Sequence, residues 1–282
     1  MPDFSKILLT VDFDRTLTGP DSKIPERNIE AIRYFMENGG TFTVNTGRST
    51  TTFAQYLETL PRNAQLLLYN GSAGYDKGQL IDTLEIDLDP LQVISDMRRL
   101  FPDMNLELQG ADNHYLIEPT PNAEAYYKGM NWGYAIFDEN TPLYPFLKFS
   151  LFGQTEKPAV SDLFRASEEE IRYFEEAAAT IQKMYAGKVD VMLAAPRIID
   201  VQAIGVSKCA AARNLQKKLG KEILVCVGDA HNDIAMLDGA DYAFCPADAI
   251  VADRYENVCE CGKGAVADVI YEKIPMICEN QP

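Results

Sequence analysis

Short runs rich in apolar and β-branched residues alternate with amphipathic segments in the first third of the chain. Residues 7–11, 41–45 and 66–69 are such runs, and they are typical of strands buried on both faces of a sheet. In residues 25–39 the apolar side chains recur at helical spacing, with a proline at the start and glycine at the end. Residues 46–60 also favour helix. This alternation of strands and helices predicts a doubly wound parallel sheet.

The pattern changes at about residue 84. Two helices and five strands are predicted in the following stretch: helices over 91–101 and 167–185, and strands over 105–108, 115–118, 147–152, 189–193 and 198–201. Because strands here follow one another with few helices between them, we expect an α+β unit with its own small antiparallel sheet. It interrupts the first pattern and is therefore expected to be an inserted domain.

The alternation of helices and strands then resumes to the end of the chain. Its predicted elements are a helix over 207–219, a strand over 223–227, a helix from 234, a strand over 242–245 and a last helix over 264–273. The fold class is therefore α/β, with a Rossmann-like doubly wound parallel sheet as core and an inserted α+β cap domain. The expected boundaries are a first core segment, the cap and a second core segment, at 1–83, 84–202 and 203–282.

Polar side chains follow the predicted strands of the parallel sheet. Asp12 and Asp14 come directly after the first strand, and their spacing puts both side chains on one face while the chain stays extended. Thr46, Asn70 and Asp229 follow three further strands. Ligands of doubly wound sheets bind beyond the carboxyl ends of the strands, which is where all of these residues fall. Two carboxylates as close as Asp12 and Asp14 need a cation, a shared proton or both.

Composition and charge limit the possible partners. The chain has 282 residues, of which 46% are hydrophobic, and a formal net charge of −16. Nucleic acid and anionic membrane surfaces favour basic faces, so neither is expected as a partner. The six cysteines show no CxxC spacing and are expected to be reduced thiols in a cytoplasmic protein. No signal peptide or membrane-spanning run is evident.

The polar clusters together match the needs of phosphoryl transfer through an aspartyl-phosphate. A carboxylate that attacks a phosphate meets charge repulsion, and Mg²⁺, which prefers oxygen ligands, would relieve it. Asp12 and Asp229 can supply two such oxygens, and a backbone carbonyl near Asp14 a third. Lys208, one residue after a plausible helix N-cap, can neutralise both the nucleophile and the transferring group.

The remaining roles fall on the second cluster and on Asp14. Thr46 offers a hydroxyl, and Gly47 an unobstructed amide, to the phosphoryl oxygens. Asp14 can donate a proton to the leaving oxygen and later take one from water. This role requires a raised pKa, which a neighbouring carboxylate and partial burial can provide.

The four clusters resemble the motifs of a known superfamily. The segments DFDRTLT, NTGR, GVSK and GDAHND, in that order, look like the four motifs of haloacid dehalogenase (HAD) superfamily phosphatases. An insert between the second and third motifs resembles the Cof-type, subclass IIB branch, and the closing segment GKGAVADVIYEKI is similar to the tail of that branch. The wording of the first motif is also similar to phosphoserine phosphatases, whose cap is inserted earlier in the chain.

The resemblance implies a role for each matching residue. Asp12 would be the nucleophile and Asp14 the general acid and base, assisted by Thr46 and Lys208. The positions implied to bind phosphate or substrate are Thr46, Gly47, Arg48, Asn70, Gly71 and Lys208. The positions implied to hold or support Mg²⁺ are Asp12, Asp14 through its carbonyl, Asp229, Asn232 and Asp233. One residue departs from the family pattern, because Arg15 stands where the family usually has glycine.

Several other residues have both a structural and a functional interpretation. His231 is expected to be a loop histidine, because the chemistry already has its acid and base, and for His114 in the insert the sequence assigns no role. Arg48 could contact either the cap or the substrate. The aromatic-rich stretch of the insert is expected to be mostly core, with one or two of the following on the substrate: Tyr115, Tyr126, Tyr127, Lys128 and Trp132.

The sequence thus predicts Mg²⁺-dependent hydrolysis of a small phosphorylated metabolite, by resemblance a sugar phosphate. Two alternatives remain open. A phosphomutase would use the same aspartyl-phosphate and return the phosphoryl group to substrate. A regulatory protein would bind a phosphorylated metabolite without turnover, and Arg15 is the feature that favours it. A monomer or small homo-oligomer is expected.

Overall fold

In the computed structural model, apolar runs from both ends of the chain form one parallel sheet. The structure describes residues 2–57, 59–130, 132–140, 143–154 and 165–279. The strands lie in the order β14-β13-β12-β1-β2, and all neighbours are parallel. Their bounds are β1 (Ile7–Val11), β2 (Thr41–Val44), β12 (Ile223–Val227), β13 (Tyr242–Pro246) and β14 (Glu256–Val258).

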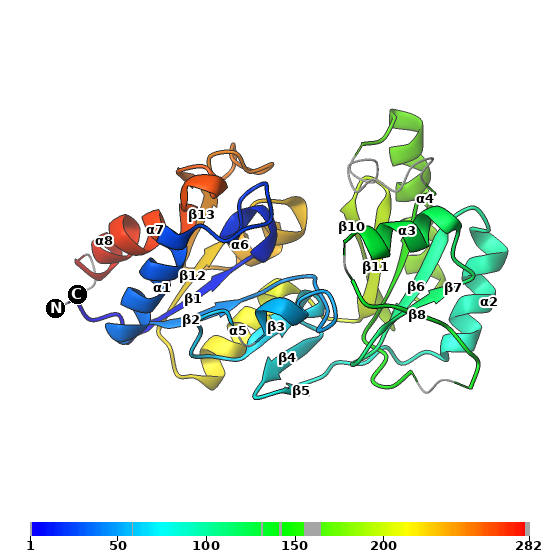
Figure 1. Ribbon diagram of the computed structural model, residues 1–282, viewed down its shortest axis with the longest axis horizontal. Coiled ribbons are helices and arrows are strands. Elements are labelled where there is room, and N and C mark those ends of the chain that lie inside the picture. Colours follow the sequence, from blue (N-terminus) through cyan, green and yellow to red (C-terminus); the bar gives the residue numbers. More distant parts are fainter. Residues whose placement is uncertain (1, 58, 131, 141–142, 155–164, 280–282) are drawn as a thin grey trace. The chain divides into compact units, whose positions relative to one another are not determined.

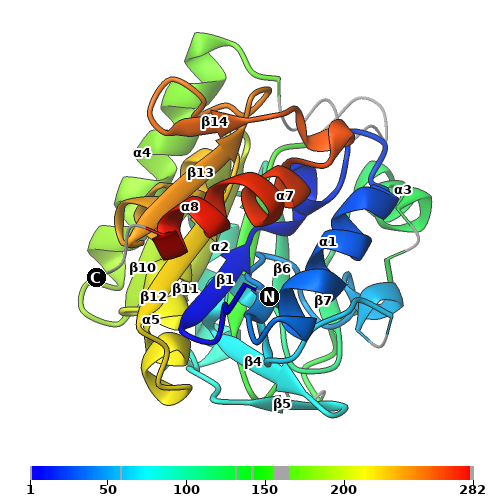
Figure 2. The same cartoon turned by 90° about the vertical axis from the view of Figure 1, so that its left-hand side faces the viewer.

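Helices cover both faces of this sheet (Figures 1 and 2). On one face α1 (Glu26–Glu37) packs against α7 (Ala265–Asp268), which continues through a helical turn into α8 (Ile274–Glu279). On the other, α5 (Lys208–Lys218) packs against α6 (Ile234–Asp238). Because both faces are covered, every residue of β1 and β12 is buried.

The third apolar run is used differently from the first two. β3 (Leu66–Leu68) meets the end of β2 through a single parallel bridge between Asn45 and Leu67. It then pairs with β4 (Ala73–Asp76), and β4 with β5 (Gln79–Ile81), in a separate antiparallel sheet. The sequence pattern did not predict β4 and β5.

The chain divides into two compact units. The first comprises residues 1–47, 56–81 and 207–282, and the second comprises 48–55 and 82–206. The chain crosses between them directly after Gly47 and directly before Ser207, so two crossings adjoin predicted phosphate-binding residues. The short segment 48–55 lies in the second unit although the sequence around it belongs to the first.

The second unit contains a six-stranded sheet in the order β10-β11-β9-β6-β7-β8. All neighbours are antiparallel except β7 and β8. The strands are β6 (Asn105–Gln109), β7 (His114–Ile117), β8 (Ala135–Ile136), β9 (Lys148–Phe152), β10 (Val189–Ala195) and β11 (Ile198–Ala203). The helices are α2 (Pro90–Leu100), α3 (Pro121–Gly129) and α4 (Glu168–Met184).

The two faces of this sheet differ in chemistry. On one face, side chains such as Leu108 and Phe149 join residues of α2 and α4 in an apolar core. Among the described residues, the opposite face carries eight buried polar or charged side chains: Asn105, Glu107, Gln109, His114, Lys148, Ser150, Asp200 and Gln202. Buried polar groups require partners, and several on this face bond to one another, as Lys148 and Ser150 both do to Asp200.

The observed elements confirm the predicted fold class, an α/β core with a parallel central sheet and an added α+β part. Some local predictions were wrong. The described residues of 46–60, all except residue 58, form no regular α-helix, and those at 54–56 make a 3₁₀ turn. The predicted last helix is divided into α7, a helical turn and α8. The helix α3 was not predicted.

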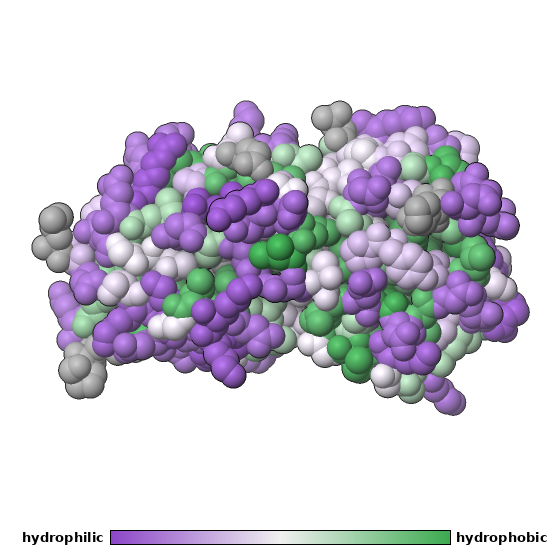
Figure 3. All heavy atoms as spheres, turned by 90° about the horizontal axis from the view of Figure 1, so that it is seen from below, coloured by the Kyte–Doolittle hydropathy of each residue, from purple (hydrophilic) through white to green (hydrophobic). Residues whose placement is uncertain are grey.

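One face of the first unit is mainly polar (Figure 3). Figure 3 shows hydrophilic side chains over most of the face of this unit seen from below. Among the residues described, no helix combines the length and the apolar character needed to cross a membrane.

Candidate active site

Asp12 and Asp229 lie at the carboxyl ends of neighbouring strands. Val11 of β1 is directly opposite Val227 of β12, and the backbone N–H of Asp12 donates to the Val227 carbonyl at 2.8 Å. Asp229 follows β12 after a single glycine. The residues Asp12 and Asp229 are 6% and 4% exposed. The parallel register therefore brings two carboxylates together that are far apart in the sequence.

Lys208 connects these carboxylates to a third one. Its ammonium group donates to Asp12 Oδ1 at 2.5 Å and to Asp233 Oδ1 at 2.7 Å. Lys208 is the first residue of α5, and Ser207 caps that helix by accepting the Ala210 N–H at 3.0 Å. The cap fixes where α5 begins and so aims the lysine at the strand ends.

Asp233 organises the loop that carries Asp229. Its Oδ2 accepts the backbone N–H groups of Asp229 at 3.1 Å and Ala230 at 3.2 Å. A Cβ on Gly228 would lie 2.6 Å from the Asp233 Cβ, so only glycine leaves room for this side chain. Asn232 lies beside it and is partly buried, and Asp233 is fully buried. Asp233 therefore holds Lys208 and the Asp229 backbone at the same time.

The carboxylates of Asp12, Asp229 and Asp233 are suited to hold a divalent cation. Each has an oxygen within 4.8 Å of the others, and all three are buried. Thr16 orients Asp229 by donating its hydroxyl to Oδ1 at 3.2 Å. Three carboxylates face one ammonium group, so the cluster lacks positive charge. Oxygen donors of this kind are the ligands that Mg²⁺ prefers.

The pKa values of two carboxyl groups in the cluster are raised, as expected where negative charge is buried with too little positive charge. Burial raises the pKa of Asp229 to about 7, and the Asp233 carboxylate adds to this shift. Burial also raises the pKa of Asp12, with Lys208 opposing the shift. Burial alone would lower the pKa of Lys208, but Asp12 and Asp233 outweigh it and raise that pKa above its ordinary value. A bound cation would favour the ionised carboxylates.

Asp14 and Arg15 lie in the turn after Asp12, where the backbone of neither residue is α-helical, and Asp14 is partly exposed. Arg15 has φ of +57°, in the left-handed region that glycine adopts most easily. The guanidinium of Arg15 lies 3.8 Å from Asp248 Oδ2, and its side chain is about half exposed. Backbone geometry thus explains why glycine suits this position, and the arginine side chain has a carboxylate partner of its own.

The second cluster lies where β2 and β3 end. Thr46 is buried, its N–H donates to the Leu67 carbonyl at 2.9 Å, and its carbonyl accepts the Asn70 N–H at 2.9 Å. A Cβ on Gly47 would lie 2.8 Å from Asn70 Oδ1, so the loops meet closely. Gly71 has φ of +98° and lies against the N-terminus of α5. Thr46, Gly47, Asn70 and Gly71 are therefore one interlocked group.

Other candidates of the sequence have mainly structural surroundings. Arg48 belongs to the second unit, where it donates to the Thr52 carbonyl at 3.0 Å and lies 5.9 Å from the Trp132 ring centroid. His231 is exposed. Tyr126, Tyr127 and Trp132 pack edge-to-face on one another. Sequence reasoning missed Ser49, whose hydroxyl contacts the buried His114. No pattern in the sequence signals that pair.

The chain is similar to known hydrolases over most of its length. A model of the haloacid dehalogenase-like hydrolase family matches residues 9–254. The chain is 25% identical to the 5-amino-6-(5-phospho-D-ribitylamino)uracil phosphatase YcsE of Bacillus subtilis over 236 residues. The aligned region covers 83% of this chain and 80% of YcsE. It is 24% identical over 287 residues to an uncharacterized hydrolase, C215.10 of Schizosaccharomyces pombe, with 93% and 89% covered.

Solved structures share the fold. SMU.1108c from Streptococcus mutans superposes with a TM-score of 0.78 at 19% identity, over 95% of this chain and 98% of that one. BT1666 from Bacteroides thetaiotaomicron, described among the phosphatases of the HAD superfamily, superposes with a TM-score of 0.75 at 17% identity, over 95% and 94%. At these identities the likeness shows the fold alone.

Proposed function

This chain belongs to the haloacid dehalogenase-like hydrolases and is a phosphatase of the Cof type, and we propose that it hydrolyses small phosphorylated metabolites through a phosphorylated Asp12. The observation that carries the proposal is the position of Lys208. Its ammonium group lies between the buried carboxylates of Asp12 and Asp233. A nucleophilic carboxylate next to a fixed cation is the arrangement that attack on an anionic phosphoryl group requires.

In the first step, a carboxylate oxygen of Asp12 forms a bond to phosphorus and the bond from phosphorus to the leaving oxygen breaks. Asp14 gives a proton to that oxygen, so the leaving group departs as an alcohol. Lys208 holds Asp12 in place and offsets charge on the transferring group. The hydroxyl of Thr46 and the amide of Gly47 bind the phosphoryl oxygens.

In the second step, water replaces the alcohol. Asp14, now ionised, removes a proton from water, whose oxygen bonds to phosphorus while the bond to Asp12 breaks. Inorganic phosphate leaves and both aspartates return to their initial states. One residue thus serves as acid and then as base because each step reverses its protonation.

Mg²⁺ would be held by Asp12, Asp229 and the carbonyl of Asp14, with Asn232 and Asp233 supporting that site. Three buried carboxylates beside one ammonium group support this assignment. When bound, the cation supplies positive charge that reduces the repulsion between the nucleophile and the phosphoryl oxygens.

We propose a phosphorylated sugar or polyol as the substrate class. YcsE, the relative from Bacillus subtilis, is named for a substrate whose phosphate sits on a ribityl chain. The name of that relative supports a phosphorylated sugar or polyol as the substrate class of this chain. The second unit, acting as a cap, would select the leaving group. A screen of phosphorylated sugars and polyols, with release of inorganic phosphate as the readout, would identify the specific metabolite.

The test of the reaction compares Asp12→Asn with wild type on p-nitrophenyl phosphate and on the best metabolite of that screen, with Mg²⁺. We expect kcat to fall by about 10³-fold or more. Asp138→Asn is the matched control, because Asp138 is exposed and, among the described residues, hydrogen-bonds to Asn140 alone, and it should retain wild-type kcat. Undiminished activity of Asp12→Asn would exclude the nucleophile, and an isomer of the substrate in place of free phosphate would indicate a mutase.

A further inference from the structure

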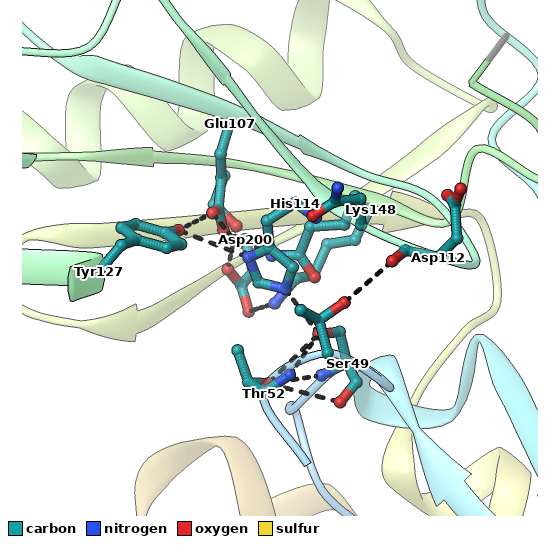
Figure 4. Close-up of polar contacts among 12 residues, drawn as sticks. Ser49, Thr52, Glu107, Asp112, His114, Tyr127, Lys148 and Asp200 are labelled. Atoms are coloured by element: carbon teal, nitrogen blue, oxygen red, sulfur yellow. Dashed lines mark hydrogen bonds and ion pairs between the residues drawn. The ribbon is translucent and has the colours of Figure 1, made fainter. Parts of the chain in front are cut away.

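Ser49, His114 and Glu107 form a continuous line of hydrogen bonds in the second unit (Figure 4). Ser49 Oγ lies 2.6 Å from His114 Nε2, and His114 Nδ1 lies 3.1 Å from Glu107 Oε2. The three residues are 1%, 4% and 5% exposed. None of them belongs to the four motifs, so the proposed reaction leaves this buried line without a role.

Glu107 is held firmly enough to orient the histidine. The Tyr127 hydroxyl donates to Oε2, and Gln109 Nε2 donates to Oε1 at 2.5 Å. Burial alone would raise the pKa of Glu107, but its neighbours His114, Lys148 and Gln109 together outweigh burial and lower that pKa, which favours the carboxylate. A carboxylate beside Nδ1 keeps a proton on that nitrogen, so in the neutral imidazole Nε2 is the acceptor for the Ser49 hydroxyl.

The connectivity of serine, histidine and carboxylate resembles a catalytic triad, but Ser49 is not placed as a nucleophile. Its side chain is 1% exposed, so no second substrate can reach it. Its oxygen already accepts the Thr52 N–H at 3.1 Å. The hydroxyl therefore donates to His114 and accepts from the backbone, which is the pattern of a structural tether.

Ser49 lies close in the chain to two residues that are proposed to bind phosphate, Thr46 and Gly47. Residues 48–55 belong to the second unit, whereas Thr46 and Gly47 belong to the first. The turn after Ser49 is closed on itself, since the Ser49 N–H donates to Thr52 Oγ1 at 3.0 Å and the Phe53 N–H donates to the Ser49 carbonyl at 2.9 Å. Fixing Ser49 therefore fixes the chain three residues after Thr46.

We propose that His114 is a positioning residue for phosphoryl transfer, which holds Ser49 and thereby the backbone of the Thr46–Gly47 loop. Glu107 and Tyr127 support it by fixing the imidazole. This inference rests on the proposed function of Thr46 and Gly47. A small displacement of groups that bind the transferring phosphoryl group costs a large factor in rate, so a distant tether can control kcat.

A pair of serine variants separates this role from general stability. Ser49→Ala removes the hydroxyl that His114 holds. Ser150→Ala makes the same chemical change at a residue of equal burial on the same sheet face, where the hydroxyl donates to Asp200 at 2.7 Å. We expect kcat on p-nitrophenyl phosphate to fall about tenfold in Ser49→Ala and to stay within about twofold of wild type in Ser150→Ala. Equal losses in both would overturn the proposal.

Two histidine variants test the contact from the other side. The amide of glutamine reaches the position of Nε2, whereas the shorter amide of asparagine reaches only that of Nδ1. His114→Gln can therefore still contact Ser49, and His114→Asn can contact only Glu107. We expect His114→Gln to retain more of kcat than His114→Asn, and the reverse order would contradict the assignment.

Hydrogen–deuterium exchange provides a readout that does not depend on activity. In wild type and in the Ser49→Ala and Ser150→Ala variants, exchange is followed in peptides that span residues 45–55. We expect faster exchange only in Ser49→Ala, and unchanged exchange there would exclude the tether. A wild-type enzyme inactive on all phosphate esters would instead refute the proposed function, while the exchange data would still decide whether His114 fixes this loop.

Discussion

The ammonium group of Lys208 lies 2.5 Å from a carboxylate oxygen of Asp12, although 196 residues separate the two in the chain. Both side chains are more than nine-tenths buried, and Asp233 accepts a second hydrogen bond from the same nitrogen. One lysine thus stabilises two carboxylates that would be costly to bury alone. This dependence leads to the first prediction.

Lys208→Met should reduce both stability and activity. Removing one partner of a buried ion pair leaves an unpaired charge and costs about 3–5 kcal/mol in the free energy of unfolding. Loss of the fixed cation should also lower kcat by about 10²–10³-fold. Urea unfolding and a phosphatase assay measure the two effects. Lys217→Met is the control, because Lys217 is exposed on the same helix, and a comparable loss there would refute the explanation.

Gly71→Ala should disturb the site through α5. Gly71 has φ of +98°, and a Cβ would lie 2.6 Å from the Ala211 Cβ and 2.8 Å from the Ser207 carbonyl oxygen. The overlap should cost about 1–3 kcal/mol beyond backbone strain and displace Lys208. Gly78→Ala has a similar φ of +81° with open space around it, so it should show about 1–2 kcal/mol of strain alone. Thermal unfolding and kcat distinguish the two variants. If Gly78→Ala loses as much activity as Gly71→Ala, the overlap with α5 is not the cause of the loss.

Arg15→Gly should remain active. Glycine relieves a left-handed backbone that costs other residues about 1–2 kcal/mol, and the exposed contact with Asp248 contributes at most about 1 kcal/mol. We expect kcat and KM on p-nitrophenyl phosphate to change less than about fivefold. Arg15→Ala removes the side chain but keeps the strain, so it separates the two effects. A large rise in KM in both variants would show that Arg15 binds substrate.

The metal-free protein should lose stability as the pH rises toward neutrality. The pKa of Asp229 is raised by burial to about 7 in the folded chain, from an ordinary value of 3.8. The folded state therefore binds the proton more tightly than the unfolded state. The resulting stability is fully present below pH 3.8 and is lost as the pH rises through about 7.

Thermal unfolding at pH 5.5 and pH 7.5, with Mg²⁺ or with EDTA, measures this effect. Because the cation competes with the proton for Asp229, Mg²⁺ should raise Tm more at the higher of these two pH values. Asp229→Asn should reduce the difference between the two pH values, and what remains is expected from Asp12, whose pKa is also raised by burial. An equal rise of Tm at both pH values in the wild type would contradict the assignment of Asp229.

Much of the site could be predicted from local pattern. Parallel strands end at one edge of their sheet, so the order of runs and polar clusters already places Asp12, Thr46 and Asp229 near one another. A serine before Lys208 predicts the helix N-terminus that the structure shows. The failed helix over 46–60 has a local cause as well, because the bonds between Ser49 and Thr52 compete with helical hydrogen bonds.

The sequence by itself determined the kind of fold, the superfamily and the residues at the strand ends, because these depend on periodicity and on short motifs. Only the tertiary structure decided that Lys208 divides its ammonium group between Asp12 and Asp233, and that His114 holds Ser49. Such pairs join residues far apart in the chain, and no local spacing encodes them. Their geometry is set by strand register and by the burial that forces each polar group to find a partner.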